Sequence, residues 1–209
     1  MPNYQRGYAW QDKQVNALWK DIFNIFNEDN LSSNKNKANL HYMGVLAIDE
    51  KKKGVYHIVD GQQRITTIIF LIKALIDVAE TDGEKEVLTS VLFNEDKFKK
   101  YNIDESSKLK LKPIKSDNKQ LLYLMANQVE KMDKSSGIYK NYDLFCRLIK
   151  GALAKDENLS IEKIYDGIEH LSCAMIKLEE EEKGKEQEIF ERINSTGVPL
   201  NLADKIRNF

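Results

Sequence analysis

Residues 55–79 read VYHIVDGQQRITTIIFLIKALIDVA and join a strand-like run, a turn and an amphipathic helix without a linker. The run 55–59 ends at Asp60-Gly61, a pair suited to a sharp turn because glycine tolerates positive φ and aspartate bonds its own backbone. Burying each Ile or Leu of the following helix stabilises the fold by about 1.5–3 kcal/mol, so we expect this helix in the core. Its apolar residues recur with the period of one helical face: Ile65, Ile68, Ile69, Ile72, Leu75, Ile76 and Ala79.

Polar side chains crowd the head of this predicted helix. Free backbone N–H groups and the helix dipole favour an anion such as phosphate at this end. The alternative is that Asp60 is an N-cap, Arg64 a surface charge and the threonines ordinary helix-start residues. Capping needs one side-chain oxygen, so the excess of polar groups indicates a ligand site. The cluster consists of Asp60, Gln62, Gln63, Arg64, Thr66 and Thr67.

Composition restricts the partners and the compartment. The 209 residues are 42% hydrophobic, enough for a proper core, and they carry a formal net charge of −1. No overall field therefore attracts nucleic acid or membrane, and such a contact needs a local patch. Cys146 and Cys173 are too few for a disulfide framework or a zinc cluster, and we expect reduced core thiols in a cytoplasmic protein. No apolar run is long enough to span a bilayer, so no membrane partner is expected.

The opening residues 1–10 read MPNYQRGYAW. Tyr4, Tyr8 and Trp10 alternate, and an extended segment would place them on one side with Arg6 between them. A packed N-terminal strand and a ligand role are both open for these aromatic residues. Arg6 is a candidate phosphate clamp, because a guanidinium offers two bonds in one plane.

Periodicity predicts the remaining elements. Lysines 51–53 fit a solvated turn, with a nucleic-acid contact as the less favoured alternative. The alternating KLKLK of residues 108–112 predicts an edge strand protected by its lysines. Strands are expected at 42–48 and 173–178 and a turn at 49–54, and helices at 11–27, 118–132, 139–154 and 160–171, the last capped by Ser160.

The last stretch, residues 190–209, reads FERINSTGVPLNLADKIRNF. A helix through Ile193 is expected to end at Asn194, and Pro199 prevents its continuation. Asn201 then caps another helix that reaches the chain end at Phe209. We therefore expect a fragment of a longer protein.

Three segments, NYQRGYAW (3–10), VDGQQRITTI (59–68) and FERINSTGVPLNLADKI (190–206), resemble in order and spacing the DGQQR-motif N-terminal domain of GmrSD-like type IV restriction enzymes. YMGVLAI (42–48) and LKLKPIKSDN (109–118) are also similar to that family. The resemblance implies an α+β fold with a small ParB/sulfiredoxin-like mixed sheet and packed helices in residues 1–80. A mainly helical region, 81–188, and a truncated C-terminal motif segment that closes the site, 189–209, follow.

The resemblance also implies a domain that binds and hydrolyses a nucleoside triphosphate (NTP) and gates a nuclease in phage defence. Asp60, Gln63 and Arg64 look like the catalytic residues, with Asp60 as ligand to Mg²⁺ or another divalent cation. The implied partners are an NTP (GTP, UTP, CTP or ATP), DNA in the full-length system, and a nuclease domain or subunit in cis or trans. The implied nucleotide-binding residues are Gln5, Arg6, Tyr8, Trp10, Gly61, Gln62, Thr66, Thr67, Asn194, Thr196 and Gly197.

Two other functions stay open from the sequence. One is a nucleotide- or DNA-binding switch without hydrolysis, and the other is a ParB-like DNA nuclease. His41, His57 and His170 form no His-Asn-His nuclease pattern. This makes the nuclease the least favoured of the three functions. We rank the hydrolase first and the switch second.

Overall fold

The computed structural model describes residues 7–31, 41–94, 108–112, 115–179, 184–185 and 188–189. No helix in these ranges is both long and apolar enough to cross a membrane. The elements in chain order are α1 (Asp12–Leu31), β1 (His41–Lys52), β2 (Val55–Asp60), α2 (Gln62–Val78), α3 (Asp82–Leu92), α5 (Lys115–Met125), the 3₁₀ helix η1 (Val129–Lys131), α6 (Gly137–Leu153), α7 (Ile161–Glu169) and β3 (Leu171–Lys177).

The three strands form a mixed sheet in the order β2-β1-β3. β1 pairs antiparallel with β2, with Ile48 opposite Ile58, and parallel with β3, with Leu46 opposite Met175. The expected hairpin is confirmed, although β1 runs on to Lys52 and leaves a shorter turn than residues 49–54. The extra residues pair because the β-branched run of β2 offers a partner along its whole length.

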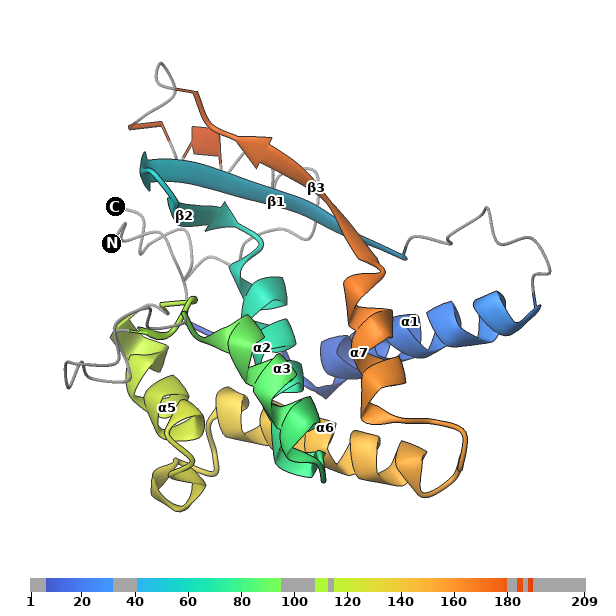
Figure 1. The fold of residues 1–209 in the computed structure, drawn as a ribbon. Coiled ribbons are helices and arrows are strands. Elements are labelled where there is room, and N and C mark those ends of the chain that lie inside the picture. The colour runs from blue at the N-terminus through green and yellow to red at the C-terminus, as the bar shows by residue number, and fades with distance from the viewer. Residues whose placement is uncertain are drawn as a thin grey trace.

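The sheet forms one layer, and the helices gather on one side of it (Figure 1). α2 leaves the end of β2 and runs into the helical layer, where it packs on α6 and α3. α7 lies beside α1 and leads into β3, which returns the chain to the sheet (Figure 1). The α+β class is confirmed, whereas the ParB/sulfiredoxin-like assignment stays a prediction.

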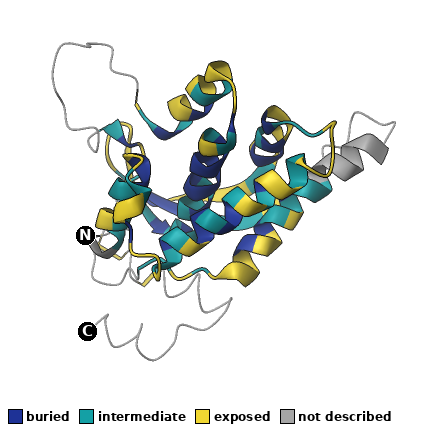
Figure 2. Ribbon diagram, turned by 90° about the horizontal axis from the view of Figure 1, so that it is seen from below, coloured by how far each residue is buried: buried dark blue, intermediate teal, exposed yellow. Residues whose placement is uncertain are grey.

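α2 is the centre of the hydrophobic core (Figure 2). Other helices pack around α2, so its burial extends beyond the predicted face. Phe70, Leu71 and Leu75 are fully buried, although only Leu75 lies on that face. They belong to one cluster that extends from Val15 of α1 to Ile168 of α7. This cluster contains residues on both sides of residue 80, where we expect a domain boundary, and that boundary stays a prediction.

Two expected elements are wrong in the described part of the chain. The helix expected over 118–132 ends at Met125, because Asn127 takes a left-handed conformation with φ of 56°. Asparagine tolerates that region better than most residues. The strand expected at 108–112 is a single antiparallel bridge between Leu109 and Phe93. Leu109 is buried in the helical core, so this segment ties down the end of α3 and adds no strand to the sheet.

The two cysteines lie in different surroundings. Cys146 is partly buried on α6 and packs against the core, as expected. Cys173 is exposed on β3, which is one of the two outer strands of the described sheet. The expectation of a core thiol is therefore wrong for Cys173, because an outer strand leaves part of its length without cover.

Candidate functional site

The turn between β2 and α2 leaves the head of the helix open. Gly61 is the N-cap residue, with φ of 95°, and it supplies no side-chain cap. The N–H of Ile65 donates to the Gly61 carbonyl at 3.1 Å. Within the described chain, no acceptor faces the backbone N–H groups of Gln62, Gln63 or Arg64. The positive end of the helix dipole therefore has donors available for an anion.

Asp60 is not the N-cap of α2. Its Oδ2 accepts a hydrogen bond from Nη2 of Arg64 at 2.9 Å. The side chains of this ion pair are 16% exposed for Asp60 and 25% exposed for Arg64. The pair is therefore neither in bulk water nor sealed in the core, and the alternative that Asp60 only caps the helix is wrong.

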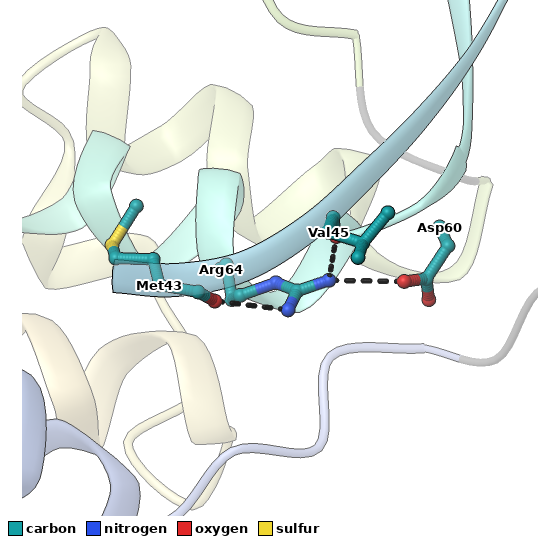
Figure 3. Close-up of polar contacts among 4 residues, drawn as sticks. All are labelled: Met43, Val45, Asp60 and Arg64. Atoms are coloured by element: carbon teal, nitrogen blue, oxygen red, sulfur yellow. Dashed lines mark hydrogen bonds and ion pairs between the residues drawn. The ribbon is translucent and has the colours of Figure 1, made fainter. Parts of the chain in front are cut away.

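The Arg64 guanidinium joins α2 to the central strand (Figure 3). Nη1 donates to the carbonyl of Met43 at 3.0 Å, and Nη2 donates to the carbonyl of Val45. With Asp60, these bonds use three of the five N–H donors that an arginine carries. Two N–H groups have no acceptor among the described residues and are available for a ligand.

Two glycines make room for this guanidinium. Gly44 has φ of 98°, and a Cβ placed on it would meet Nη1 of Arg64. A Cβ on Gly61 would lie 2.7 Å from Leu46 Cδ1 and 3.3 Å from Arg64 Nη2. β1 is irregular between Tyr42 and Val45, where the guanidinium meets it. Glycine is needed here for its backbone freedom and for its missing side chain.

Gln63 holds the backbone of residues 7–10, a segment that we call the strap. Its Oε1 accepts from the N–H of Ala9 at 2.7 Å, and its Nε2 donates to the carbonyl of Gly7 at 3.1 Å. The orientation of the amide is fixed, because the N–H can only donate and the carbonyl can only accept. Gln63 was expected to be catalytic, and orienting a water with this amide would require breaking these bonds.

Tyr8 attaches the strap to the helical layer. Its hydroxyl lies 2.7 Å from Thr67 Oγ1 and accepts from Asn141 Nδ2 at 2.8 Å. Its ring meets Phe70 edge to face at 4.9 Å between centroids. Burial raises the pKa of Tyr8 to about 12, although the hydrogen bonds with Thr67 and Asn141 partly oppose this rise. The hydroxyl therefore stays protonated and can donate at every ordinary pH.

Two residues outside the motif segments complete the attachment of the strap. The second N–H of Asn141 donates to the carbonyl of Trp10 at 2.8 Å. The carboxylate of Asp117 on α5 accepts from the N–H of Tyr8 at 2.6 Å. Trp10 packs against the core, so the two described aromatic residues of the opening segment have structural roles.

The other predicted site residues are placed as follows. Gln62 reaches back to donate to the carbonyl of Ile58 at 2.8 Å, which braces the end of β2. Thr66 is partly buried on the first turns of α2. The described residues contain no group of three His, Cys, Asp or Glu side chains that could hold a metal. The remaining predicted residues lie outside the described part of the chain: Gln5, Arg6, Asn194, Thr196 and Gly197.

A second polar cluster lies toward the other end of α2. Lys73 pairs with Asp77 and donates to Asn127 Oδ1 at 2.7 Å, although its side chain is only 4% exposed. The hydroxyl of Tyr142 on α6 donates to Asp77 Oδ2 at 2.6 Å. Burial, together with the bond to Asp77, raises the pKa of Tyr142. This cluster is separate from the head of α2.

Sequence reasoning missed Asn141, Asp117 and Gly44. Asn141 had a detectable signal, since it stands on the apolar stripe of α6 and is 1% exposed. A polar residue on a core stripe predicts a buried hydrogen bond, although not its partner. Asp117 and Gly44 gave no such signal, because their contacts depend on how distant segments meet.

The whole chain matches a known protein family. Residues 1–209 match the family described as GmrSD restriction endonuclease, N-terminal domain. No curated protein sequence matches the chain. The residues that carried the resemblance, from Asp60 to Thr67, are those that organise the head of α2. The chain therefore belongs to the GmrSD restriction endonuclease N-terminal domain family.

Proposed function

We propose that this domain binds the triphosphate of an NTP at the head of α2 and hydrolyses it. The observation that carries the proposal is the uncapped start of the helix, where Gly61 leaves three N–H groups open beside the Arg64 guanidinium. An uncapped helix start next to a fixed arginine suits a phosphate group. Arg6, which precedes the strap in the sequence, is proposed as a second phosphate contact.

Asp60 suits the role of cation ligand in this proposal. Its Oδ1 has no hydrogen-bond partner among the described residues, whereas Oδ2 is held by Arg64. Mg²⁺ needs few protein ligands, because it keeps waters and binds substrate phosphates. When bound, such a cation would offset phosphate charge during hydrolysis. Arg64 holds the carboxylate in one position for that contact.

A switch without hydrolysis is the second candidate, and one observation favours it. Both ends of the Gln63 amide bind the strap, so this side chain is not available to position a water. Binding of an NTP could then change the docking of the strap without chemistry. The two candidates share one site and differ in whether phosphate is released.

We further propose that this domain regulates DNA cleavage. The family is one of restriction endonucleases, and its description assigns the match to an N-terminal domain. In this proposal the NTP state of the domain gates a nuclease domain or subunit, and DNA is a partner of the complete system. The sequence evidence for phage defence rests on the same family membership.

The test is phosphate release from ATP, GTP, CTP and UTP, each with Mg²⁺ or with EDTA. Asp60→Asn keeps the volume and removes the charge, and we expect at least about a 100-fold loss of turnover. Asp143→Asn is the matched control, because Asp143 pairs with Arg147 at the same i,i+4 spacing on α6. Equal turnover of wild type and Asp60→Asn would remove Asp60 from the mechanism, and no phosphate release by wild type with any of the four NTPs would contradict the hydrolase. Tight Mg²⁺-dependent binding with no turnover in wild type would favour the switch.

A further inference from the structure

The hydrogen bonds around Tyr8 form a chain whose direction is fixed. The N–H groups of Asn141 face the Trp10 carbonyl and the Tyr8 hydroxyl. The hydroxyl of Thr67 donates its single proton to the Gln63 carbonyl at 2.7 Å. Tyr8 must therefore donate to Thr67, because the Thr67 oxygen has no second proton to give. The donors run from Asn141 to Tyr8, from Tyr8 to Thr67, and from Thr67 to Gln63.

This series of hydrogen bonds links three different parts of the fold. Asn141 belongs to α6, Tyr8 to the strap, and Thr67 to α2. Thr67 and Asn141 are 0% and 1% exposed, so water cannot replace a lost partner without opening the core. Aligned hydrogen bonds in such surroundings reinforce one another. The docking of the strap therefore depends on a residue in the helical layer.

We propose that Asn141 is a positioning residue for the nucleotide site. It holds the strap through Tyr8 and Trp10, and the strap in turn meets Gln63 in the first turn of α2, next to the open N–H groups. This inference rests on the proposed function. Asn141 touches neither the open N–H groups at the head of α2 nor Asp60, so its effect on the nucleotide is indirect.

The variant that tests this role is Asn141→Leu, which keeps the approximate volume and removes both donors. We expect nucleotide affinity and KM to weaken at least about tenfold. We expect kcat to change less than KM, because Asp60 and Arg64 keep their partners. Tyr8→Phe is the second variant, and it removes only the hydroxyl in the middle of the chain. In Tyr8→Phe, KM should also change more than kcat, but by a smaller factor than in Asn141→Leu.

The control for general destabilisation is Phe145→Leu. Phe145 is fully buried one turn further along α6 and belongs to the hydrophobic core. This variant loosens the same helix without removing a bond to the strap. Its KM and its nucleotide affinity should stay within about twofold of wild type.

A second readout follows the strap itself. The sequence holds two tryptophans, Trp10 and Trp19, so a Trp19→Phe background leaves Trp10 as the only indole. Acrylamide quenching of Trp10 should rise at least about twofold in Asn141→Leu and stay low in Phe145→Leu, because local opening exposes the indole.

The experiment combines quenching with calorimetric titration of ATP, GTP, CTP and UTP in the presence of Mg²⁺. Weaker NTP binding and stronger quenching in Asn141→Leu, but not in Phe145→Leu, would support the positioning role. Unchanged NTP binding in Asn141→Leu, or an equal loss in Phe145→Leu, would overturn it. A wild-type chain that binds none of the four NTPs would refute the proposed function and, with it, the effect on the nucleotide. In that case the quenching would still show whether Asn141 holds the strap.

Discussion

The two ends of α2 carry buried polar groups that are built in different ways. Toward the C-terminal end, Lys73 and Asp77 form an ion pair that Asn127 and Tyr142 complete. Toward the head, neutral groups of Thr67, Tyr8 and Asn141 form a chain between helices. Both groups connect α2 to α6, but only the hydrogen-bond chain at the head includes a residue of the opening segment 3–10, namely Tyr8.

The difference separates stability from function. The ammonium of Lys73 is buried and is costly to leave without its anion, so the loss of Asp77 is felt by the whole fold. Leaving a buried neutral group without its partner costs about 1–3 kcal/mol, which is less than an unpaired buried charge costs, so the loss is felt mainly by what the bond positions. We therefore expect the C-terminal ion pair to determine whether the domain folds. We expect the hydrogen bonds at the head to determine how the strap docks.

Breaking the C-terminal pair should have the largest effect. Asp77→Asn leaves the Lys73 ammonium, whose side chain is only 4% exposed, without its anion and should lower the free energy of unfolding by about 3–5 kcal/mol, measured by urea denaturation. The control is Arg147→Met, which breaks an ion pair whose side chains are 67% and 46% exposed. That variant should lose less than about 1 kcal/mol. Equal losses in the two variants would show that burial of the pair is irrelevant.

A methyl group on Gly44 should disturb the head of α2 more moderately. Gly44→Ala forces a left-handed φ on alanine and places Cβ against the Arg64 guanidinium. We expect a loss of about 1–3 kcal/mol in the free energy of unfolding. Gly151→Ala is the control, since nothing lies within 4 Å of its added Cβ in α6. That variant should gain up to about 1 kcal/mol from helix propensity, and a loss there would contradict the argument.

Raising the pH above 10 should weaken the head of α2 gradually. The pKa of Tyr8 is raised from 10.0 to about 12, so between these values the folded chain keeps a proton that the unfolded chain releases. Stability is therefore complete below pH 10 and falls as pH rises, by up to about 1.4 kcal/mol per pH unit. Urea denaturation of wild type and Tyr8→Phe across this range checks it. The stability difference between the two proteins should shrink as pH rises, and a constant difference would contradict the burial of Tyr8.

The sequence predicts the local part of this arrangement. The turn at Gly61 and the helix after it follow from glycine freedom and a helical period, which are properties of neighbouring residues. The period predicts only part of the buried face, since Phe70 and Leu71 are fully buried outside it. The cap at Ser160 is confirmed for the same reason, since its hydroxyl accepts from the N–H of Lys163 at 3.2 Å. The ligand site predicted from the excess of polar groups near Gln63 stays a prediction, and one of these groups, the Gln63 amide, binds the chain's own strap.

The long-range part could not be predicted from one sequence. Asn141 is 133 residues away from Tyr8 in the sequence, and Asp117 is 109 residues away, yet both bind it. Such contacts depend on the packing of whole helices, which periodicity does not specify. The apolar stripe of α6 could have marked Asn141 as an unusual core residue, but only the structure identifies its partner.

A double-mutant cycle tests the central claim, that the motif strap and the helical layer are one hydrogen-bonded unit. The free energy of unfolding is measured for wild type, Tyr8→Phe, Asn141→Leu and the double variant. Because each substitution breaks the same bond, we expect the losses to fall short of additivity by at least about 1 kcal/mol. Losses that add to within about 0.5 kcal/mol would show that Asn141 and Tyr8 act independently, and would contradict the account.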